Sequence, residues 1–305
     1  MISAFHSCTL QKLRPMITAR EIFPDFDYGG FAMSLVHLNF QSYYLEGNTD
    51  VSVILPDYPI WTPEQAGSPK QYYSSGKKYK VLWLLHGTYG DHTDWLRKSR
   101  IELYATELDL IVVMPSGLNA NYINWETFSI GYRMWDYLTE ELMPLIQGWF
   151  PASDKKEDNF IAGLSMGGAG ALQYAVGHPD LFAGAAVLSC CAADYTHLRD
   201  SDAQPVWGRR LQNMVRDAGG VDAFLNTPSN VWNRLEAWNQ IPDRPRLYCA
   251  IGKNDFLYKD YLHFKDHMQS LGIDAQFEEY EGYEHEWRFW DLTIQKALAF
   301  FGLSQ

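Results

Sequence analysis

The stretch FIAGLSMGGAG, residues 160–170, surrounds one serine with glycines and begins with a short apolar run. Gly163, Ser165 and Gly167 form the pattern G-x-S-x-G, in which a strand turns directly into a helix and presents the serine at the bend. The residues FIAG suit a strand, and the small residues after Ser165 suit a helix. The stretch therefore predicts a strand, a tight turn and a helix, in that order.

Steric crowding explains the glycines of this pattern. A serine at such a turn has a strained backbone, and a Cβ two residues before or after it would collide with the neighbouring strand or helix. Glycine at 163 and 167 removes those atoms, and the helix start then directs free N–H groups and a positive dipole toward Ser165. A phosphate-binding P-loop is excluded, because Ala169 and Gly170 follow where that motif requires lysine and serine or threonine.

Elsewhere in the chain, apolar runs alternate with helical patterns. Runs typical of strands cover residues 34–41, 51–56, 79–87, 108–115, 159–163, 184–189, 246–252 and 274–281, and helical patterns cover 134–150, 166–177, 256–272 and 287–302. Several runs are apolar throughout, as in parallel strands covered on both faces. We therefore expect the α/β class: a doubly wound, mostly parallel sheet, with an antiparallel hairpin turned by Gly47 and Asn48 at one edge.

The length of 305 residues predicts one α/β domain with additional segments. Residues 1–30 are interpreted as an N-terminal extension and residues 31–305 as the domain. A tryptophan-rich segment at about 193–243 has no strand pattern and is predicted to be a helical insertion at the carboxyl end of the sheet, where α/β folds bind ligands. The sequence leaves open whether this insertion is a lid or a helical decoration that only packs on the sheet.

Charge and cysteine content limit the partners of the protein. The net charge of −12 would repel nucleic acid and anionic lipid surfaces, so neither is an expected partner. The four cysteines, including the adjacent Cys190 and Cys191, lack the spacing of a zinc site or a disulfide framework. No apolar stretch has the length of a signal peptide or a membrane span. We expect a cytoplasmic protein, unless a signal has been removed, and homo-oligomerisation is left open.

A serine hydroxyl needs a base, and the base needs an acid that orients it. With this elbow, the acid and then the histidine follow the serine along the chain. His285 lies in the loop EGYEHEW after the last predicted strand, and Asp255 lies three residues after the strand that ends at Gly252. We predict Ser165, Asp255 and His285 as a catalytic triad; the alternative for Asp255 is an Asx turn or helix cap.

Other candidate groups were weighed in the same way. The backbone N–H groups of Met166 and Thr88 are predicted to bind the oxyanion. His86 is interpreted as a structural residue of the Thr88 loop. His263 and His267 have the spacing of a metal pair but no apparent third ligand, so a solvated helix face is preferred.

Five tryptophans are candidates for lining the acyl or alcohol pocket, since large flat side chains bury apolar groups with little entropy loss. Core packing explains each of them equally well. They are Trp125, Trp207, Trp232, Trp238 and Trp287.

Several stretches together resemble the tributyrin-esterase branch of the esterase D family, α/β-hydrolase-fold proteins that include short-chain acyl esterases and feruloyl esterases. These stretches are LLHGTYGDHTDW, LIVVMPSG, FIAGLSMGGAGALQYA, GKNDFLY and EHEWRFW, and the resemblance covers about residues 35–305. It implies a serine hydrolase without a cofactor or metal, with Ser165, Asp255 and His285 as its triad and Thr88 and Met166 as its oxyanion amides.

The resemblance implies a carboxylesterase that acts on small short-chain acyl or feruloyl-type esters. The chain departs from S-formylglutathione hydrolases, a sister group with S-G-L-T-C at the oxyanion loop, because it has HGTYG at residues 86–90. That difference argues against a glutathione thioester, which remains an alternative substrate. An acyltransferase with the same triad is a further alternative, and a non-catalytic binding module is the least favoured.

Overall fold

The computed structural model describes residues 32–60, 66–128, 130–198 and 207–303. The predicted N-terminal extension lies outside these residues. The strands are β1 (Ala32–Ser42), β2 (Gly47–Asp57), β3 (Val81–Leu85), β4 (Ile111–Pro115), β5 (Asn124–Trp125), β6 (Tyr132–Arg133), β7 (Asn159–Leu164), β8 (Gly184–Leu188), β9 (Arg246–Gly252) and β10 (Ala275–Tyr280). The α-helices are α3 (Pro69–Tyr73), α4 (Asp94–Lys98), α5 (Ile101–Leu108), α6 (Met134–Asp136), α7 (Met143–Trp149), α8 (Met166–Gly177), α9 (Trp207–Ala218), α10 (Val221–Leu225), α11 (Val231–Arg234), α12 (Tyr258–Ser270) and α13 (Trp287–Phe300), with a π-helical turn η1 (Tyr137–Leu142) and 3-10 turns η2 (Lys156–Asp158) and η3 (Leu235–Gln240).

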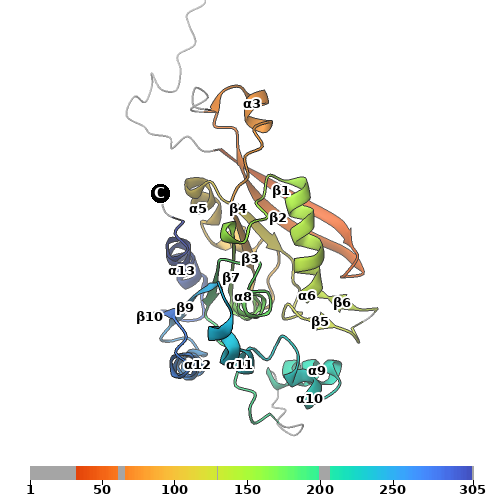
Figure 1. Ribbon diagram of the computed structural model, residues 1–305, viewed down its shortest axis with the longest axis vertical. Coiled ribbons are helices and arrows are strands. Elements are labelled where there is room, and N and C mark those ends of the chain that lie inside the picture. The colour runs from red at the N-terminus through yellow and green to blue at the C-terminus, as the bar shows by residue number, and fades with distance from the viewer. Residues whose placement is uncertain (1–31, 61–65, 129, 199–206, 304–305) are drawn as a thin grey trace, which may run out of the picture.

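The main sheet has eight strands in the order β1-β2-β4-β3-β7-β8-β9-β10 (Figure 1). All neighbours from β4 to β10 are parallel, whereas β1 pairs with β2, and β2 with β4, in antiparallel fashion. The predicted mostly parallel sheet with an antiparallel hairpin at one edge is confirmed. The turn is displaced from the prediction: Gly47 and Asn48 already pair with Ser42 and Gln41, and Glu46, with a φ of 54°, precedes them.

The central strands are buried on both faces. In β3, successive side chains belong to two different cores: Val81, Trp83 and Leu85 to one, and Leu82 and Leu84 to the other. Helices α6–α8 and α12 contribute to the first core, and α4, α5 and α13 to the second. This arrangement explains the uninterrupted apolar runs in the sequence, since each strand must present apolar side chains to both layers.

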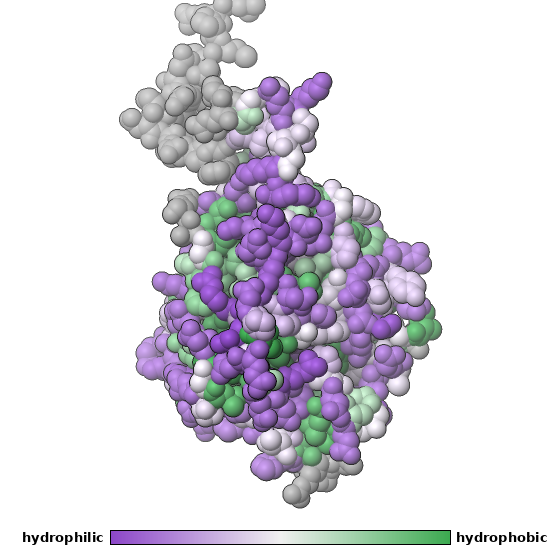
Figure 2. Space-filling model, in the orientation of Figure 1, coloured by the Kyte–Doolittle hydropathy of each residue, from purple (hydrophilic) through white to green (hydrophobic). Residues whose placement is uncertain are grey.

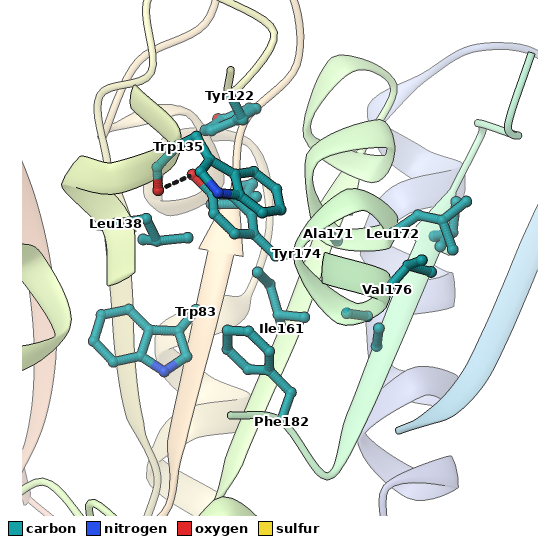
Figure 3. Packing of buried hydrophobic residues seen from close by; sticks show 14 of the residues in the cluster. Trp83, Tyr122, Trp135, Leu138, Ile161, Ala171, Leu172, Tyr174, Val176 and Phe182 are labelled. Carbon is teal, nitrogen blue, oxygen red and sulfur yellow. Dashed lines mark hydrogen bonds between the residues drawn. The ribbon is translucent and has the colours of Figure 1, made fainter. Parts of the chain in front are cut away.

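The first core is rich in aromatic side chains. Figure 3 shows Trp83 and Ile161 from the sheet, with Tyr174 of α8 and Trp135 of α6 packed above them. The rings of Trp135 and Tyr174 stack with centroids 4.5 Å apart, and the Tyr174 hydroxyl donates to the Trp135 carbonyl at 3.3 Å. These contacts fix α8, the helix that follows Ser165, against the sheet and its neighbouring helix.

Two differences from the predicted elements have physical causes. The predicted helix over residues 134–150 is interrupted by η1, directly before Pro144, whose ring lacks the N–H that a regular α-helical turn requires. Helices α4 and α5 and the β5–β6 hairpin were not predicted, because their apolar patterns are too short to be periodic.

The predicted bounds of α8 and β9 are confirmed as residues 166–177 and 246–252.

The insertion between β8 and β9 forms α9, α10, α11 and η3, and its described residues contain no strand. Helices α9 and α10 lie at one end of the molecule, next to β5 and β6, and α3 lies at the opposite end (Figure 1). The Asp217 carboxylate of α9 accepts the N–H groups of Glu126 and Thr127 at 2.9 and 2.8 Å, which joins α9 to the β5–β6 segment.

The surface in Figure 2 is mostly hydrophilic, with apolar residues in small separate groups. Within the described parts of the chain, no helix combines the length and the apolar character needed to cross a membrane.

Candidate active site

Ser165 occupies the turn between β7 and α8. Its backbone has φ 52° and ψ −119°, a left-handed conformation that costs a non-glycine residue about 1–3 kcal/mol. Its N–H donates to the Leu188 carbonyl of β8 at 2.8 Å, and its carbonyl accepts the Ala169 N–H at 3.0 Å. The neighbouring strand and the first turn of α8 thus hold Ser165 in the strained conformation.

The glycines of the G-x-S-x-G pattern lie where the prediction requires them. A Cβ at Gly163 would lie 2.2 Å from the Gly167 carbonyl oxygen, and a Cβ at Gly167 would lie 2.4 Å from the Leu85 carbonyl oxygen of β3. Both atoms belong to the backbone and cannot move aside as a side chain could. The steric prediction for positions 163 and 167 is therefore confirmed.

Asp255 lies in the loop between β9 and α12 and makes two contacts. Its Oδ2 is 2.8 Å from His285 Nδ1, and its Oδ1 accepts the Leu257 N–H at 3.0 Å. One oxygen therefore closes a turn before α12 while the other contacts the histidine. The Asp255 side chain is 0% exposed, so water does not compete for this pair.

The contacts of His285 determine its orientation and tautomer. Because a carboxylate only accepts hydrogen bonds, the neutral ring must donate from Nδ1 and keep its lone pair on Nε2. The rings of Phe256 and Trp290 flank it, with centroids 4.7 and 5.0 Å away, and Trp290 Nε1 donates to Ser189 Oγ at 3.0 Å. The imidazole is held in the state that a general base requires.

The loop after β3 passes directly against Ser165. A Cβ at Gly87 would lie 3.4 Å from the Ser165 Cβ and 2.5 Å from Leu164 Cδ1. His86 is buried; its Nδ1 donates to the Gly87 carbonyl at 2.7 Å, and its Nε2 accepts the Gly117 N–H at 2.8 Å. Burial lowers the pKa of His86 and favours its neutral form. These bonds give His86 the structural role that the sequence predicts.

A cavity of about 580 Å³ brings several predicted residues together. Ser165, Met166 and Thr88 line it, together with Phe256, whose ring packs on His285. Among the described residues, Ser165 Oγ forms no hydrogen bond, so it has none with His285 in this conformation. The structure therefore joins Asp255 to His285 directly, and Phe256, which packs on His285, lines the same cavity as Ser165.

The insertion forms the wall of this cavity opposite α8. Arg210, Leu211 and Met214 of α9 line it, and Arg210 Nη1 donates to Thr88 Oγ1 at 3.2 Å. Partial burial lowers the pKa of Arg210, although an arginine remains charged. These three residues were not among the predicted site residues. They are separated by one, three and four positions within a helical pattern, and this spacing could have indicated that they share one face of a helix.

For two of the tryptophans, the structure favours core packing, one of the two interpretations that the sequence left open. Trp232 and Trp238 are buried in the first core. Trp232 stacks on His267 and His263, with ring centroids 3.9 and 4.9 Å away. The His263 side chain is 64% exposed and its Nε2 lies 3.2 Å from Asp194 Oδ2, so this histidine lies on a solvated helix face as predicted. Packing of α11 on α12 places Trp232 in the core, and neither Trp232 nor Trp238 lines the cavity beside Ser165.

Trp125 and Trp287 also fall outside the lining of this cavity. Trp125 lines a separate cavity and donates from Nε1 to the Ala120 carbonyl at 2.8 Å. Trp287 packs edge-on against Trp95, with ring centroids 5.2 Å apart. Trp207 begins α9, and its side chain lies outside the described atoms.

The model of the family described as "Putative esterase" matches residues 65–301 of the chain. An acetyl esterase from Caldicellulosiruptor saccharolyticus is 29% identical over 271 residues, which are 87% of this chain and 97% of that protein.

Two solved structures from Staphylococcus aureus are similar over nearly the whole chain. One is the fluorophosphonate-binding serine hydrolase FphF with bound substrate, which is 29% identical with a TM-score of 0.70 and coverage of 91% of this chain and 100% of that one. The other is the S-formylglutathione hydrolase FrmB, which is 29% identical with a TM-score of 0.69 and coverage of 90% and 100%.

Proposed function

The chain belongs to the "Putative esterase" family and is a carboxylesterase, and we propose that it cleaves esters through an acyl-enzyme formed on Ser165. In this proposal Ser165 Oγ attacks the ester carbonyl carbon while His285 Nε2 accepts the hydroxyl proton. The tetrahedral oxyanion is bound by the N–H groups of Thr88 and Met166. The C–O bond to the alcohol then breaks, and His285 returns its proton to the leaving alcohol.

The second half of the reaction regenerates the serine. Water attacks the acyl carbon, His285 takes a proton from it, and the acid leaves as Ser165 recovers that proton. Asp255 holds the Nδ1–H tautomer and stabilises the imidazolium that forms in each half. In both halves the neutral imidazole is the working base.

One observation supports this proposal: buried Asp255 contacts His285, and Phe256, which packs on His285, lines the cavity onto which the strained Ser165 opens. Ordinary helix capping would account for the Asp255 Oδ1 contact alone. Only a role in orienting His285 accounts for the use of the second oxygen. The missing contact between Ser165 and His285 is compatible with catalysis, since such hydrogen bonds often tighten only when substrate binds.

The substrates proposed are short-chain acyl or hydroxycinnamoyl esters. The similarity to an acetyl esterase supports the short-chain class, and a cavity of about 580 Å³ has room for either class. A thioester is a second candidate, because the S-formylglutathione hydrolase FrmB is as similar to this chain as FphF is. An acyltransferase would use the same residues, with an alcohol in place of the water.

Covalent labelling of Ser165 tests the acyl-enzyme. A fluorophosphonate probe is expected to modify the parent protein, and mass spectrometry should find the label on Ser165. Ser165→Ala should lose the label and about four to six orders of magnitude in turnover of p-nitrophenyl acetate. Ser270→Ala, an exposed serine on α12, serves as the control and should behave as the parent. Near-parent hydrolysis by Ser165→Ala would rule out the proposal.

A substrate panel then separates the classes. The panel comprises p-nitrophenyl esters from acetate to laurate, methyl ferulate, an acetylated sugar and S-formylglutathione. Preference for acetate or butyrate would support the short-chain class, and cleavage of methyl ferulate the hydroxycinnamoyl class. Products analysed with a competing alcohol would distinguish hydrolysis from acyl transfer.

A further inference from the structure

One face of α8 forms a continuous wall of the catalytic cavity. Ser165, Ala169 and Gln173 are spaced four residues apart, so they lie on the same side of the helix, and all three line the cavity. At a helical rise of 1.5 Å per residue, Gln173 lies about 12 Å further along the axis than Ser165. The short side chain of Ala169 leaves the space between them open.

Gln173 is buried, with 6% of its surface exposed, and its Oε1 has no hydrogen-bond partner among the described residues. A buried carbonyl oxygen without a donor costs about 1–3 kcal/mol, so native proteins rarely keep one without a reason. Thr139 and Asn230 also carry such an oxygen, but neither lines this cavity. Gln173 therefore lines the substrate cavity with an unused acceptor. Its Oε1 has less than 1 Å² of accessible surface, so substrate binding requires the terminal amide to turn about χ3 and present Oε1 to the cavity.

The remainder of the cavity wall suits a group that has both polar and apolar parts. Asn121, Tyr195 and Ser229 contribute amide and hydroxyl groups, while Met214 and Leu257 contribute apolar surface. A bare alkyl chain would leave the polar groups without partners when it displaced water. A substrate group with a hydroxyl at its far end would bury its carbon chain and still satisfy an acceptor.

We propose that Gln173 is a specificity-determining residue whose Oε1 accepts a hydrogen bond from a hydroxyl on the substrate, several bonds away from the ester carbon. This inference rests on the proposed function, because it takes Ser165 as the point of attack. The distance along α8 places the hydroxyl beyond the reach of a formyl or acetyl group itself. It belongs either to a longer acyl group or to the alcohol of a short-chain ester, and the same chemistry recognises both.

Matched substrate pairs test the proposal. The acyl pair is p-nitrophenyl 6-hydroxyhexanoate and p-nitrophenyl heptanoate, and the alcohol pair is 5-hydroxypentyl acetate and hexyl acetate. In each pair a methyl group replaces the hydroxyl. The parent enzyme is expected to favour the hydroxylated member of one pair by about tenfold in kcat/KM, because the apolar member leaves the buried oxygen unpaired. The pair that shows the preference identifies the source of the hydroxyl.

Gln173→Met removes the acceptor at nearly constant length and should reduce this ratio to about one or below. Since the substitution also removes an unpartnered buried polar atom, the variant should unfold at or above the temperature of the parent. Thr139→Val is the matched control: it removes an unpartnered buried oxygen outside the cavity and should leave the ratio unchanged.

Two results would overturn the inference. One is a parent enzyme without preference in either pair, and the other is a preference that Gln173→Met retains. Neither result would affect the proposed function, which depends on the labelling and loss of activity at Ser165. Loss of the preference in Gln173→Met, with an unchanged ratio in Thr139→Val, would support the inference about Gln173.

Discussion

The two walls of the catalytic cavity are built differently. On the sheet side, the backbones of β7, α8 and β3 pack directly against one another. A single added Cβ at Gly163 or Gly167 would lie within 2.5 Å of a carbonyl oxygen. On the insertion side, the contacts to the sheet side run through long side chains such as Arg210 and Met214. Backbone contacts cannot adjust, whereas side chains can adopt other rotamers. We therefore expect the sheet side to control whether the enzyme works at all, and the insertion to control which ester it prefers.

Gly167→Ala should disrupt the packing of α8 against β3 on the sheet side of the cavity, and it has the largest expected effect on stability and activity. The new Cβ would meet the carbonyl oxygens of Leu85 and His86 at 2.4 and 2.6 Å, so either α8 or the end of β3 must move. We expect a loss of stability of the order of 4 kcal/mol or more, with hydrolysis of p-nitrophenyl acetate abolished. Thermal unfolding and kcat/KM measure both effects.

Gly148→Ala is the control for this variant, because Gly148 is an exposed helical glycine with no atom within 4 Å of an added Cβ. It should be neutral or stabilise by about 0.5–1 kcal/mol. If Gly167→Ala were as stable and active as Gly148→Ala, the contrast between the two walls would be lost.

Acidification should lower the stability of the fold through His86, on the sheet side of the cavity, by less than Gly167→Ala does. Burial lowers the pKa of His86 from its ordinary value of about 6.5, so just below that pH the unfolded chain binds a proton that the folded chain does not. Stability is therefore greatest above about pH 6.5 and decreases as the pH falls toward the lowered pKa. Protonation would also remove the Nε2 acceptor of the Gly117 N–H.

Thermal unfolding between pH 7.5 and 5.5 measures this effect. The midpoint of the parent should fall with pH, and that of His86→Gln should fall less. In His86→Gln, part of the decrease of the unfolding midpoint with pH should persist, because burial also lowers the pKa of His92 and His178. Substitution of the exposed His197 by Gln should leave the parent profile unchanged, and an identical profile for His86→Gln would contradict the assignment.

Met214→Ala should alter the insertion side and has the smallest expected effect on activity. Met214 belongs to the walls of both the catalytic cavity and a neighbouring cavity of about 260 Å³, which Trp135 and Phe224 also line. Removing its side chain would join the two spaces. We expect kcat/KM for bulky acyl esters to increase about threefold relative to acetate, at a cost of about 2 kcal/mol in stability.

Met143→Ala controls for that loss of stability, since Met143 is buried in the core of α7 away from both cavities. Met143→Ala should destabilise the protein about as much as Met214→Ala does, without changing the preference between bulky acyl esters and acetate. An equal change of preference in both variants would show that loosened packing, rather than the joined cavities, alters selectivity.

The sequence predicted the sheet side well because its constraints are local. Gly163 and Gly167 lie within two residues of Ser165, and the apolar runs of the parallel strands are visible without any partner. The pairing of Asp255 with His285 was also predictable, because both follow strands whose carboxyl ends must share one edge of the sheet. The short elements α4, α5 and β5–β6 were missed, since each is too brief to show a period.

The insertion side could not be predicted in the same way. Its tryptophans were candidates for the pocket, yet Trp232 and Trp238 are core residues. Conversely, Gln173 lies on a helix whose bounds were predicted exactly, and its place in the cavity was still not recognised. A residue type and a helical pattern give no information about which neighbouring element covers each face.

The sequence alone determined the strand–turn–helix around Ser165 and the mostly parallel character of the sheet, because steric exclusion and hydrophobic periodicity act over a few residues. Only the tertiary structure decided which side chains line the cavity beside Ser165. That choice depends on how α9 to α11 pack against α8 and α12, through contacts between residues far apart in the chain. The same large apolar side chain can fill a core or line a pocket, and only its three-dimensional neighbours distinguish the two.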